Sequence, residues 1–264
     1  MSVWLIAILL GVVEGITEFL PVSSTGHLLL TEHLFGIKQS DLFNVVIQCG
    51  AVVAVIPLFP ERLRQLLRWR EDPQARDFIL KVLVAFGITG VGGLILDKLH
   101  FKLPETVLPV ALALLIGGVL FVAVETWLAG KPTRNDVAWT VVVAVGLGQL
   151  LAAIFPGTSR SGATILLMLI LGMGRVAATE FSFLVGIPTM LAAGGLKIFK
   201  ALHHPPLDAG PENWGALALC TVVSAIVSFI AVKWLLGFVQ THTFKGFGWY
   251  RIILAALMLI FLLR

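Results

Sequence analysis

The chain has 264 residues, of which 58% are hydrophobic and only 13% are charged. A soluble domain carries about 25% charged residues, so this composition excludes an ordinary water-soluble protein and predicts a helical protein that crosses a membrane several times. The formal net charge of +4 lies mainly in the predicted loops, and nothing in the sequence supports nucleic-acid binding.

The first apolar segment, residues 3–20, carries Glu14 and Glu18 one helical turn apart, so both lie on one face of a helix. Pro21 ends this helix, and the next apolar piece, 25–35, is too short to cross a bilayer, which takes about 20 residues. We therefore predict a re-entrant helix–loop–helix, whose loop must be buried in protein or line a cavity. No basic stretch or cleavage signal opens the chain, so this segment is expected to be retained.

Six further segments are predicted to be full transmembrane helices. They cover residues 42–59, 78–97, 106–129, 176–197, 213–236 and 249–264. The loop after the first of them is rich in arginine, which places it in the cytoplasm by the positive-inside rule. Its arginines are Arg62, Arg64, Arg68, Arg70 and Arg76. The turn-rich loop at 202–211 is then expected on the outer side.

A second broken segment lies between the third and the fourth of these spans. Residues 137–155 are apolar, Pro156 and Gly157 interrupt them, and a half-helix is expected at 159–172. This pair enters the membrane from the cytoplasm, whereas the first pair enters from outside. The predicted fold class is therefore an all-α polytopic membrane protein with six transmembrane helices and two re-entrant pairs.

The two breaks resemble each other in sequence. Two hydroxyl residues follow each proline at the second and third positions, and Glu14 or Gln149 precedes it at the seventh. The hydroxyl residues are Ser23 and Ser24 in the first break and Thr158 and Ser159 in the second. Such similarity in opposite orientation is typical of an inverted-topology repeat, with repeats at about 1–129 and 137–264 of a single membrane domain, 1–264. Chance similarity between two serine- and glycine-rich breaks is the alternative.

The polar side chains at the breaks are suited to bind an anion. A half-helix that begins in mid-membrane presents unpaired N–H groups and the positive end of its dipole, which attract phosphate. Arg160 adds a permanent charge with a planar fork that fits phosphate oxygens. Further donors are Ser23, Ser24, Thr25, Thr158, Ser159, Ser161 and Thr164. Helix capping would explain a serine or threonine but not an arginine at this depth, so we predict a phosphate site built from both breaks.

The first break also holds reactive groups. Ser24 and His27 are close enough in sequence to meet across a helical turn, and a hydroxyl beside an imidazole and a carboxylate is a common way to activate a nucleophile. We predict Ser24 as the nucleophile and His27 as its general base, while Glu18 orients the imidazole or exchanges protons itself. Direct attack by His27 on phosphorus is one alternative. The other is that His27 has only a structural role, with its ring hydrogen-bonded in the core. Glu14 is suited to hold a proton, a water molecule or a cation.

These motifs resemble the undecaprenyl-diphosphate phosphatase family, also called the bacitracin-resistance family. That family is marked by Glu-x-x-x-Glu running into Phe-Leu-Pro-Val-Ser-Ser-Thr-Gly-His, which is matched here from Glu14 to His27. Its second mark, Pro-Gly-x-Ser-Arg-Ser-Gly-Ala-Thr, is matched from Pro156 to Thr164. Two long motifs in the same order, in a resemblance over the full length, make the match specific.

The resemblance implies a hydrolase of the bacterial inner membrane that removes the terminal phosphate of undecaprenyl diphosphate. This reaction recycles the lipid carrier of peptidoglycan synthesis and, when the enzyme is abundant, confers bacitracin resistance. The resemblance also implies a site open to the periplasmic side. The functional residues carried over by motif position are Glu14, Glu18, Ser24, His27, Ser159, Arg160 and Thr164.

The resemblance leaves the cofactor and the assembly open. No cofactor is certain, and Glu14 and Glu18 are the pair that could hold Mg²⁺ or Ca²⁺. The expected partners are the lipid substrate and membrane lipids, and a homodimer is compatible with the sequence. The alternative function is flipping of a polyprenyl phosphate, because inverted repeats with broken helices are a transporter architecture.

Overall fold

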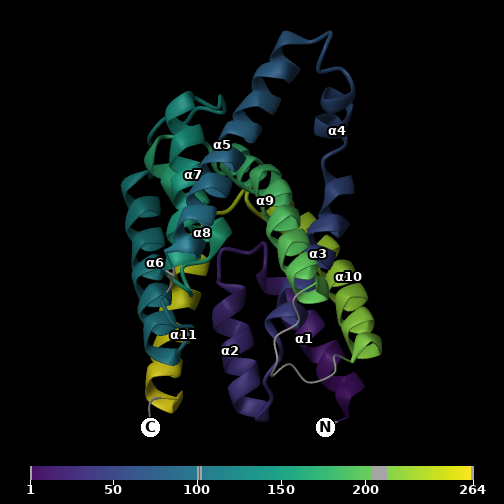
Figure 1. Cartoon of the computed structure of the whole chain (residues 1–264). Coiled ribbons are helices and arrows are strands. Elements are labelled where there is room, and N and C mark those ends of the chain that lie inside the picture. The colour runs from purple at the N-terminus through teal and green to yellow at the C-terminus, as the bar shows by residue number, and fades with distance from the viewer. Residues whose placement is uncertain (1, 100, 102, 204–212, 263–264) are drawn as a thin grey trace.

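The computed structural model describes residues 2–99, 101, 103–203 and 213–262 (Figure 1). In these ranges the regular structure consists of α-helices, one 3₁₀ turn at Ile56–Leu58 and one isolated β-bridge. The helices are α1 (Val3–Thr17), α2 (Ser24–Phe35), α3 (Asp41–Val55), α4 (Pro60–Leu67), α5 (Pro73–Lys98), α6 (Val107–Trp127), α7 (Trp139–Ile154), α8 (Arg160–Ile170), α9 (Arg175–His203), α10 (Trp214–Phe238) and α11 (Lys245–Leu262). The all-α prediction is confirmed for the described residues.

Among the described residues, four helices are long and apolar enough to cross a membrane: α5, α6, α9 and α10. A fifth candidate is the bent pair of Leu42–Leu58 and α4, which meet at 82°. Pro57 and Pro60 explain the bend, because proline lacks the N–H that would continue the helical hydrogen bonds. The chain is therefore a multi-pass membrane protein.

Several predicted boundaries differ from the observed helices. The prediction that 60–77 is only a loop is wrong, since α4 forms there with proline at its first position and an ion pair of 2.8 Å between Arg64 and Glu61. The predicted span 249–264 falls on α11, which already begins at Lys245. Most of the predicted outer loop at 202–211 lies outside the described residues.

The long helices pack in a swapped pattern. Helix α1 packs on α10 and α7 packs on α5, while α3 packs on α10 and α9 packs on α5. Helix α6 packs on α11, and α3 on α9. Exchanging α1 with α7, α3 with α9, α5 with α10 and α6 with α11 therefore interchanges the first four pairs two by two and turns α6–α11 and α3–α9 each into itself. In Figure 1 the start of α1 and the end of α11 lie at one end of the molecule and α4 lies at the other.

Two glycines allow the swapped pairs to approach closely. A Cβ atom on Gly11 of α1 would lie 2.7 Å from the carbonyl oxygen of Cys220 in α10. A Cβ atom on Gly146 of α7 would lie 2.8 Å from the Cβ of Ile88 in α5. Lipid tails are as apolar as these helices, so close backbone packing of this kind, rather than hydrophobic burial, holds membrane helices together. The two glycines thus serve the same purpose at the two equivalent contacts.

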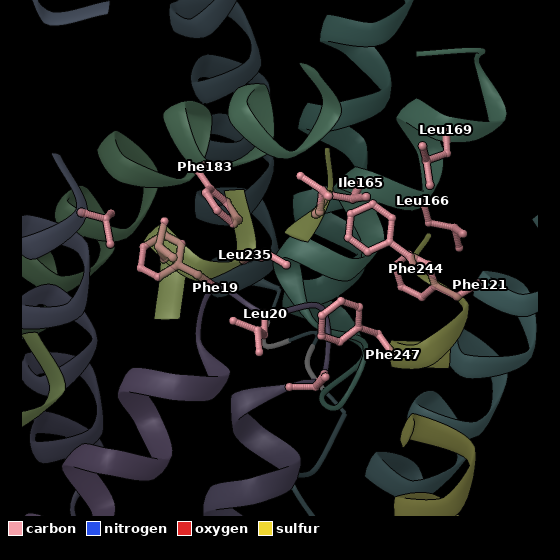
Figure 2. Close-up of a cluster of buried hydrophobic side chains, with 14 of the residues drawn as sticks. Phe19, Leu20, Phe121, Ile165, Leu166, Leu169, Phe183, Leu235, Phe244 and Phe247 are labelled. Carbon is pink, nitrogen blue, oxygen red and sulfur yellow. The ribbon is translucent and has the colours of Figure 1, made fainter. Parts of the chain in front are cut away.

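A cluster of buried apolar side chains joins the first break to α8 and α9 (Figure 2). Phe19 and Leu20 come from the loop between α1 and α2, and Ile165 comes from α8. The ring of Phe19 meets that of Phe183 in α9 edge to face, with centroids 5.0 Å apart. Edge-to-face ring pairs contribute about 0.5–1.5 kcal/mol beyond their buried area. The first loop is therefore held from the side of α8 and α9, next to the second loop.

Candidate active site

The loops that join α1 to α2 and α7 to α8 end in the same backbone geometry. Ser23 caps α2 with φ 73° and Ser159 caps α8 with φ 69°; no other non-glycine residue in the described ranges has a positive φ. The Ser23 hydroxyl accepts a hydrogen bond from the N–H of Gly26 at 3.3 Å, and that of Ser159 from Gly162 at 3.1 Å. Such backbone conformations cost about 1–3 kcal/mol each and persist only where surrounding structure imposes them, often at functional sites.

The cap positions correct the sequence pairing of the loops. Ser23 lies two residues after its proline, whereas Ser159 lies three residues after Pro156. Gly157, with φ 92°, supplies the extra residue of the second turn. The structural counterpart of Ser23 is therefore Ser159, and the pairing of Ser23 with Thr158 is wrong by one residue.

The two loops touch each other. The hydroxyl of Ser161 donates to the carbonyl oxygen of Leu20 at 3.2 Å, a contact across 141 positions in the sequence. The guanidinium of Arg160 lies 3.5 Å from a carboxylate oxygen of Glu18 and 5.6 Å from the ring centroid of Phe19. The prediction that both breaks come together is confirmed by these contacts.

Ser24 is bonded directly to a carboxylate. Its Oγ donates to Oε2 of Glu18 at 2.7 Å, while Oε1 of Glu18 faces Arg160. Glu18 is buried and Ser24 is half-buried. A hydroxyl donating to a carboxylate at this distance is poised to pass its proton to that carboxylate when the oxygen attacks an electrophile.

His27 makes different contacts from those predicted. Its Nδ1 lies 2.7 Å from the carbonyl oxygen of Ser23, and its Nε2 lies 2.6 Å from the hydroxyl of Tyr250 in α11. A carbonyl only accepts, so we assign the proton to Nδ1 and infer that Tyr250 donates to Nε2. The described residues show no hydrogen bond from His27 to Ser24 or Glu18. The expected contacts of the imidazole with them are therefore wrong, because Ser24 reaches back to Glu18 while the ring caps the Ser23 carbonyl.

Buried polar atoms without a hydrogen-bond partner gather at the loops. They include both carboxylate oxygens of Glu14 and two guanidinium nitrogens of Arg160, Nε and Nη2. The 3.5 Å separation between Nη2 and Glu18 is an ion pair that does not meet hydrogen-bond geometry. The third nitrogen, Nη1, donates to the Ser182 carbonyl oxygen at 3.4 Å. Since buried groups nearly always have partners, the free N–H groups are available for an anion and Glu14 for a proton or a cation.

The remaining predicted ligands differ in how deeply they are buried and in whether they already form hydrogen bonds within the protein. Ser161 and Thr164 are fully buried, and Thr164 shares a hydrogen bond of 2.6 Å with the hydroxyl of Ser182. Thr25 and Thr158 are half-buried. Ser161 and Thr164 thus brace the first turn of α8. Substrate binding by any of these hydroxyls stays a prediction.

A resident divalent cation fits the carboxylates poorly. Glu18 is engaged by Ser24 and Arg160, which leaves Glu14 as the free carboxylate. Across the part of the chain that the structure describes, no group of three or more His, Cys, Asp or Glu residues could hold a metal ion. Ca²⁺ takes six to eight oxygen ligands and Mg²⁺ six, so Glu14 and Glu18 form an incomplete set for either cation.

Two residues of the site were missed by sequence reasoning, and both lie on α11. Tyr250 contacts His27, and the fully buried Arg251 contacts both loops through backbone carbonyls. Neither belongs to a motif. The available signals were a charged residue inside an apolar span, which is expensive and often functional, and the chain's single tyrosine.

A pocket of about 470 Å³ adjoins the imidazole. Its walls are mostly apolar side chains from α1, α10 and α11, including Val13, Ile16 and Trp234, and its polar members are Thr17, His27 and Tyr250. A concave apolar pocket that ends in a few polar groups is typical of a site for a ligand with an apolar body and a polar head.

The chain is similar over nearly its full length to one set of proteins. A family model described as bacitracin resistance protein BacA matches residues 7–257. The undecaprenyl-diphosphatase of Rhizobium etli (strain CFN 42) is 52% identical over 255 residues, which cover 96% of this chain and 95% of the relative. That of Xanthomonas axonopodis pv. citri is 47% identical over 263 residues, covering 99% and 98%. That of Xylella fastidiosa (strain 9a5c) is 46% identical over 257 residues, covering 97% of both chains.

Proposed function

The chain belongs to the bacitracin resistance protein BacA family, and from this premise we propose that its paired loops are the centre that dephosphorylates undecaprenyl diphosphate. The products are undecaprenyl phosphate and inorganic phosphate, so the enzyme returns the lipid carrier to peptidoglycan synthesis and counters bacitracin. The observation that carries the site is the Ser24–Glu18 hydrogen bond of 2.7 Å beside an arginine with two free nitrogens.

The diphosphate is held between the beginnings of α2 and α8. The first N–H groups of each helix lack acceptors within the helix, and both dipoles present their positive ends there. Arg160 supplies two N–H groups in a planar fork, which suits two phosphate oxygens. Charge stabilisation by such fixed donors is usually the largest contribution to phosphoryl transfer.

In the first chemical step, Oγ of Ser24 attacks the terminal phosphorus. The hydroxyl proton passes to Oε2 of Glu18, the bond between the terminal phosphorus and the bridging oxygen breaks, and undecaprenyl phosphate leaves. A phosphoserine remains. Arg160 stabilises the negative charge of the phosphoryl group during the transfer.

In the second step, water attacks the phosphoserine. His27 accepts a proton from this water at Nε2, which Tyr250 occupies in the structure and must release. The oxygen of Ser24 leaves phosphorus and takes back the proton held by Glu18, inorganic phosphate departs, and His27 releases its proton to solvent. His27 therefore acts as the base for water rather than for the serine.

The lipid chain of the substrate lies along the 470 Å³ pocket. His27 and Tyr250 form its polar end, next to the reacting phosphate, and apolar side chains form its walls. The C55 chain is far longer than this pocket, so the remaining isoprenoid units extend into the bilayer. Surrounding membrane lipids and a homodimer stay predictions for the assembly.

The domain proposed for this chemistry is a single unit with six spans and two re-entrant pairs, repeated in inverted topology at about 1–129 and 137–264. The swapped helix pairs, the two close-packed glycines and the matching caps Ser23 and Ser159 support this arrangement. The arginine-rich segment around α4 is then cytoplasmic. The site opens to the periplasmic side of the bacterial inner membrane.

Cysteine labelling in intact cells tests this orientation. The native Cys49 and Cys220 are first replaced, because both are free thiols. In that background, Arg68→Cys should be labelled only after the cytoplasmic side is opened, whereas Gln39→Cys should be labelled from outside. The reverse pattern would place the arginine-rich segment outside and overturn the orientation.

Phosphate release tests the activity itself. Purified protein in detergent should release inorganic phosphate from undecaprenyl diphosphate, and the Ser24→Ala variant should not. Folded wild-type protein that releases no phosphate would contradict the proposed function.

Lipid flipping is the second candidate, and the swapped helix pairing favours it because transporters with inverted repeats alternate between two packings. In vesicles with labelled undecaprenyl phosphate, a flippase would move lipid between leaflets even as Ser24→Ala. Absence of such movement, together with phosphate release by the wild type, would leave the phosphatase alone.

A further inference from the structure

Arg251 of α11 is buried more completely than any other arginine of the described chain, with 0% of its surface exposed. Its guanidinium donates hydrogen bonds to five backbone carbonyl oxygens on three elements. The acceptors are Pro21 (3.2 Å) in the first loop, Gly157 (3.4 Å) and Thr158 (3.0 Å) in the second loop, and Ala113 (3.1 Å) and Leu114 (3.4 Å) in α6. One side chain therefore joins both loops to a transmembrane helix.

The surroundings of Arg251 differ from those of three other arginines that are at least partly buried. Those arginines each meet a carboxylate, in the pairs Arg160–Glu18, Arg175–Glu125 and Arg62–Glu180. Within the described part of the chain, no carboxylate forms an ion pair with Arg251. A buried charge is costly unless it is compensated, and here the compensation comes from carbonyl dipoles of the two loops and of α6.

Glycines make room for this guanidinium. The three atoms nearest to a Cβ placed on Gly117 of α6 all belong to the Arg251 side chain, and the closest would overlap it. A Cβ on Gly162, in the first turn of α8, would lie 2.9 Å from Nη1 of Arg251. The side chain of Arg251 thus packs closely between α6 and the start of α8, at positions where only glycine leaves room for it.

We propose that Arg251 is a positioning residue that ties the two loops together and so fixes the beginnings of α2 and α8 in the orientation that binds the phosphates. It donates to loop carbonyls that precede each half-helix, and these carbonyls are thereby held away from the phosphate. Its positive charge adds to the positive ends of the two helix dipoles. The inference rests on the proposed function of the loops, but the tether itself can be tested without any activity.

Hydrogen exchange followed by mass spectrometry tests the tether. In Arg251→Met, peptides covering 18–25 and 156–162 should both exchange faster than in the wild type, by about 10-fold or more, because the hydrogen bonds to both loops are lost together. Arg62→Met is the control, since it removes an arginine from α4 that does not contact the loops. Unchanged exchange, or faster exchange in one loop alone, would overturn the proposal.

Kinetics test the consequence for catalysis. Displacing catalytic groups by about 1 Å can cost on the order of 10²-fold in rate, so Arg251→Met should lower kcat by about 10- to 100-fold for undecaprenyl diphosphate and for farnesyl diphosphate alike. Arg251→Lys should restore part of this loss, because an ammonium can reach some of the carbonyls. A merely structural role would lower the folded fraction and leave kcat and KM per folded molecule unchanged, which would contradict positioning.

Gly117→Ala in the wild-type background keeps the test valid if Arg251→Met folds poorly, and a double-mutant cycle of the two changes connects its effect to Arg251. Gly117→Ala should lower kcat about 10-fold in the wild type, because its methyl group displaces the guanidinium, and should add no further loss to Arg251→Met. Gly118→Ala is the matched control: its Cβ would lie 2.7 Å from the carbonyl oxygen of Gly248 and 3.1 Å from the Cβ of Arg251, an atom that methionine keeps, so it should act alike in both backgrounds. Additive losses for Gly117→Ala would show that the methyl group acts independently of Arg251 and would overturn the proposal. If the wild type released no phosphate, only the proposed function would fail, while hydrogen exchange would still decide the tether.

Discussion

The loop at 18–23 and the loop at 155–159 end in the same backbone conformation but lead into half-helices with different side chains. Both end in a serine cap with positive φ, so both deliver the start of a half-helix to the same place. The first loop adds Glu18, Ser24 and His27, whereas the residue at the position of Ser24 in the second loop is Arg160. The matching caps thus present two helix beginnings, and in the proposed mechanism their side chains divide the work into attack and charge stabilisation.

The helices that lead into the loops show the same division. Glu14 of α1 keeps both carboxylate oxygens free of hydrogen bonds. Gln149, which lies at the same distance before its proline in α7, donates through Nε2 to the hydroxyl of Thr89 at 2.9 Å. One side chain is available for chemistry, and the other joins α7 to α5.

The largest effect expected from this comparison is the loss of the attacking group in the first loop. Ser24→Ala should lower phosphate release by about 10³-fold or more, because removing a nucleophile commonly eliminates the chemical step. As a control, Ser161→Ala at the start of α8 removes a serine hydroxyl bonded to the Leu20 carbonyl and should cost about 10-fold or less. Steady-state release of phosphate measures both, and equal losses would contradict the division between the loops.

Arg160→Lys should have the next largest effect. Lysine keeps the charge but lacks the planar fork, so activity should fall by about 10²-fold. Arg62 of α4 forms an ion pair with Glu180, away from the loops. The activity of Arg62→Lys should stay within about 2-fold of that of the wild type. Near-normal turnover of Arg160→Lys would remove this residue from the catalytic centre.

A smaller effect is expected where α11 supports the first loop. Tyr250→Phe keeps the ring beside His27 but removes the hydroxyl that is bonded to its Nε2. The value of kcat should therefore fall by about 10-fold. Its neighbour Trp249 is exposed, and Trp249→Phe should leave kcat unchanged. An equal change in both variants would indicate a general disturbance of α11.

The smallest effect concerns the shared backbone. Ser23→Ala and Ser159→Ala should each destabilise the protein by about 1 kcal/mol through loss of the cap. Ser23→Gly and Ser159→Gly should cost less than the alanine variants, because glycine adopts positive φ without strain. Thermal unfolding in detergent measures all four. Alanine tolerated better than glycine in either loop would mean that the two backbones are not equivalent.

The sequence predicted the features that depend on neighbouring residues, namely the positions of the breaks and the polar groups beside them. Proline and glycine predicted the two breaks, and the polar residues around them indicated the candidate site, because charged groups are expensive inside apolar segments. The ion pair between Arg160 and Glu18 was not predicted, although both residues belong to the breaks that were expected to come together.

Long-range contacts could not be predicted in this way. The pairing of His27 with Tyr250 spans 223 positions and depends on where α11 packs. The bonds from Arg251 to both loops depend on the same packing, and the one-residue difference between the loops depends on the conformation of Gly157. No pattern in the residues next to His27, Arg251 or Gly157 predicts these features.

Trapping the phosphoenzyme tests the division between the loops most directly. Rapid acid quenching during turnover of undecaprenyl diphosphate labelled at its terminal phosphorus, followed by mapping of the labelled peptide, identifies the residue that attacks. Attack by Ser24 predicts an acid-stable phosphoserine at that position, absent from the Ser24→Ala variant. An acid-labile, base-stable phosphoenzyme that still forms in Ser24→Ala would contradict this assignment and identify His27 as the nucleophile.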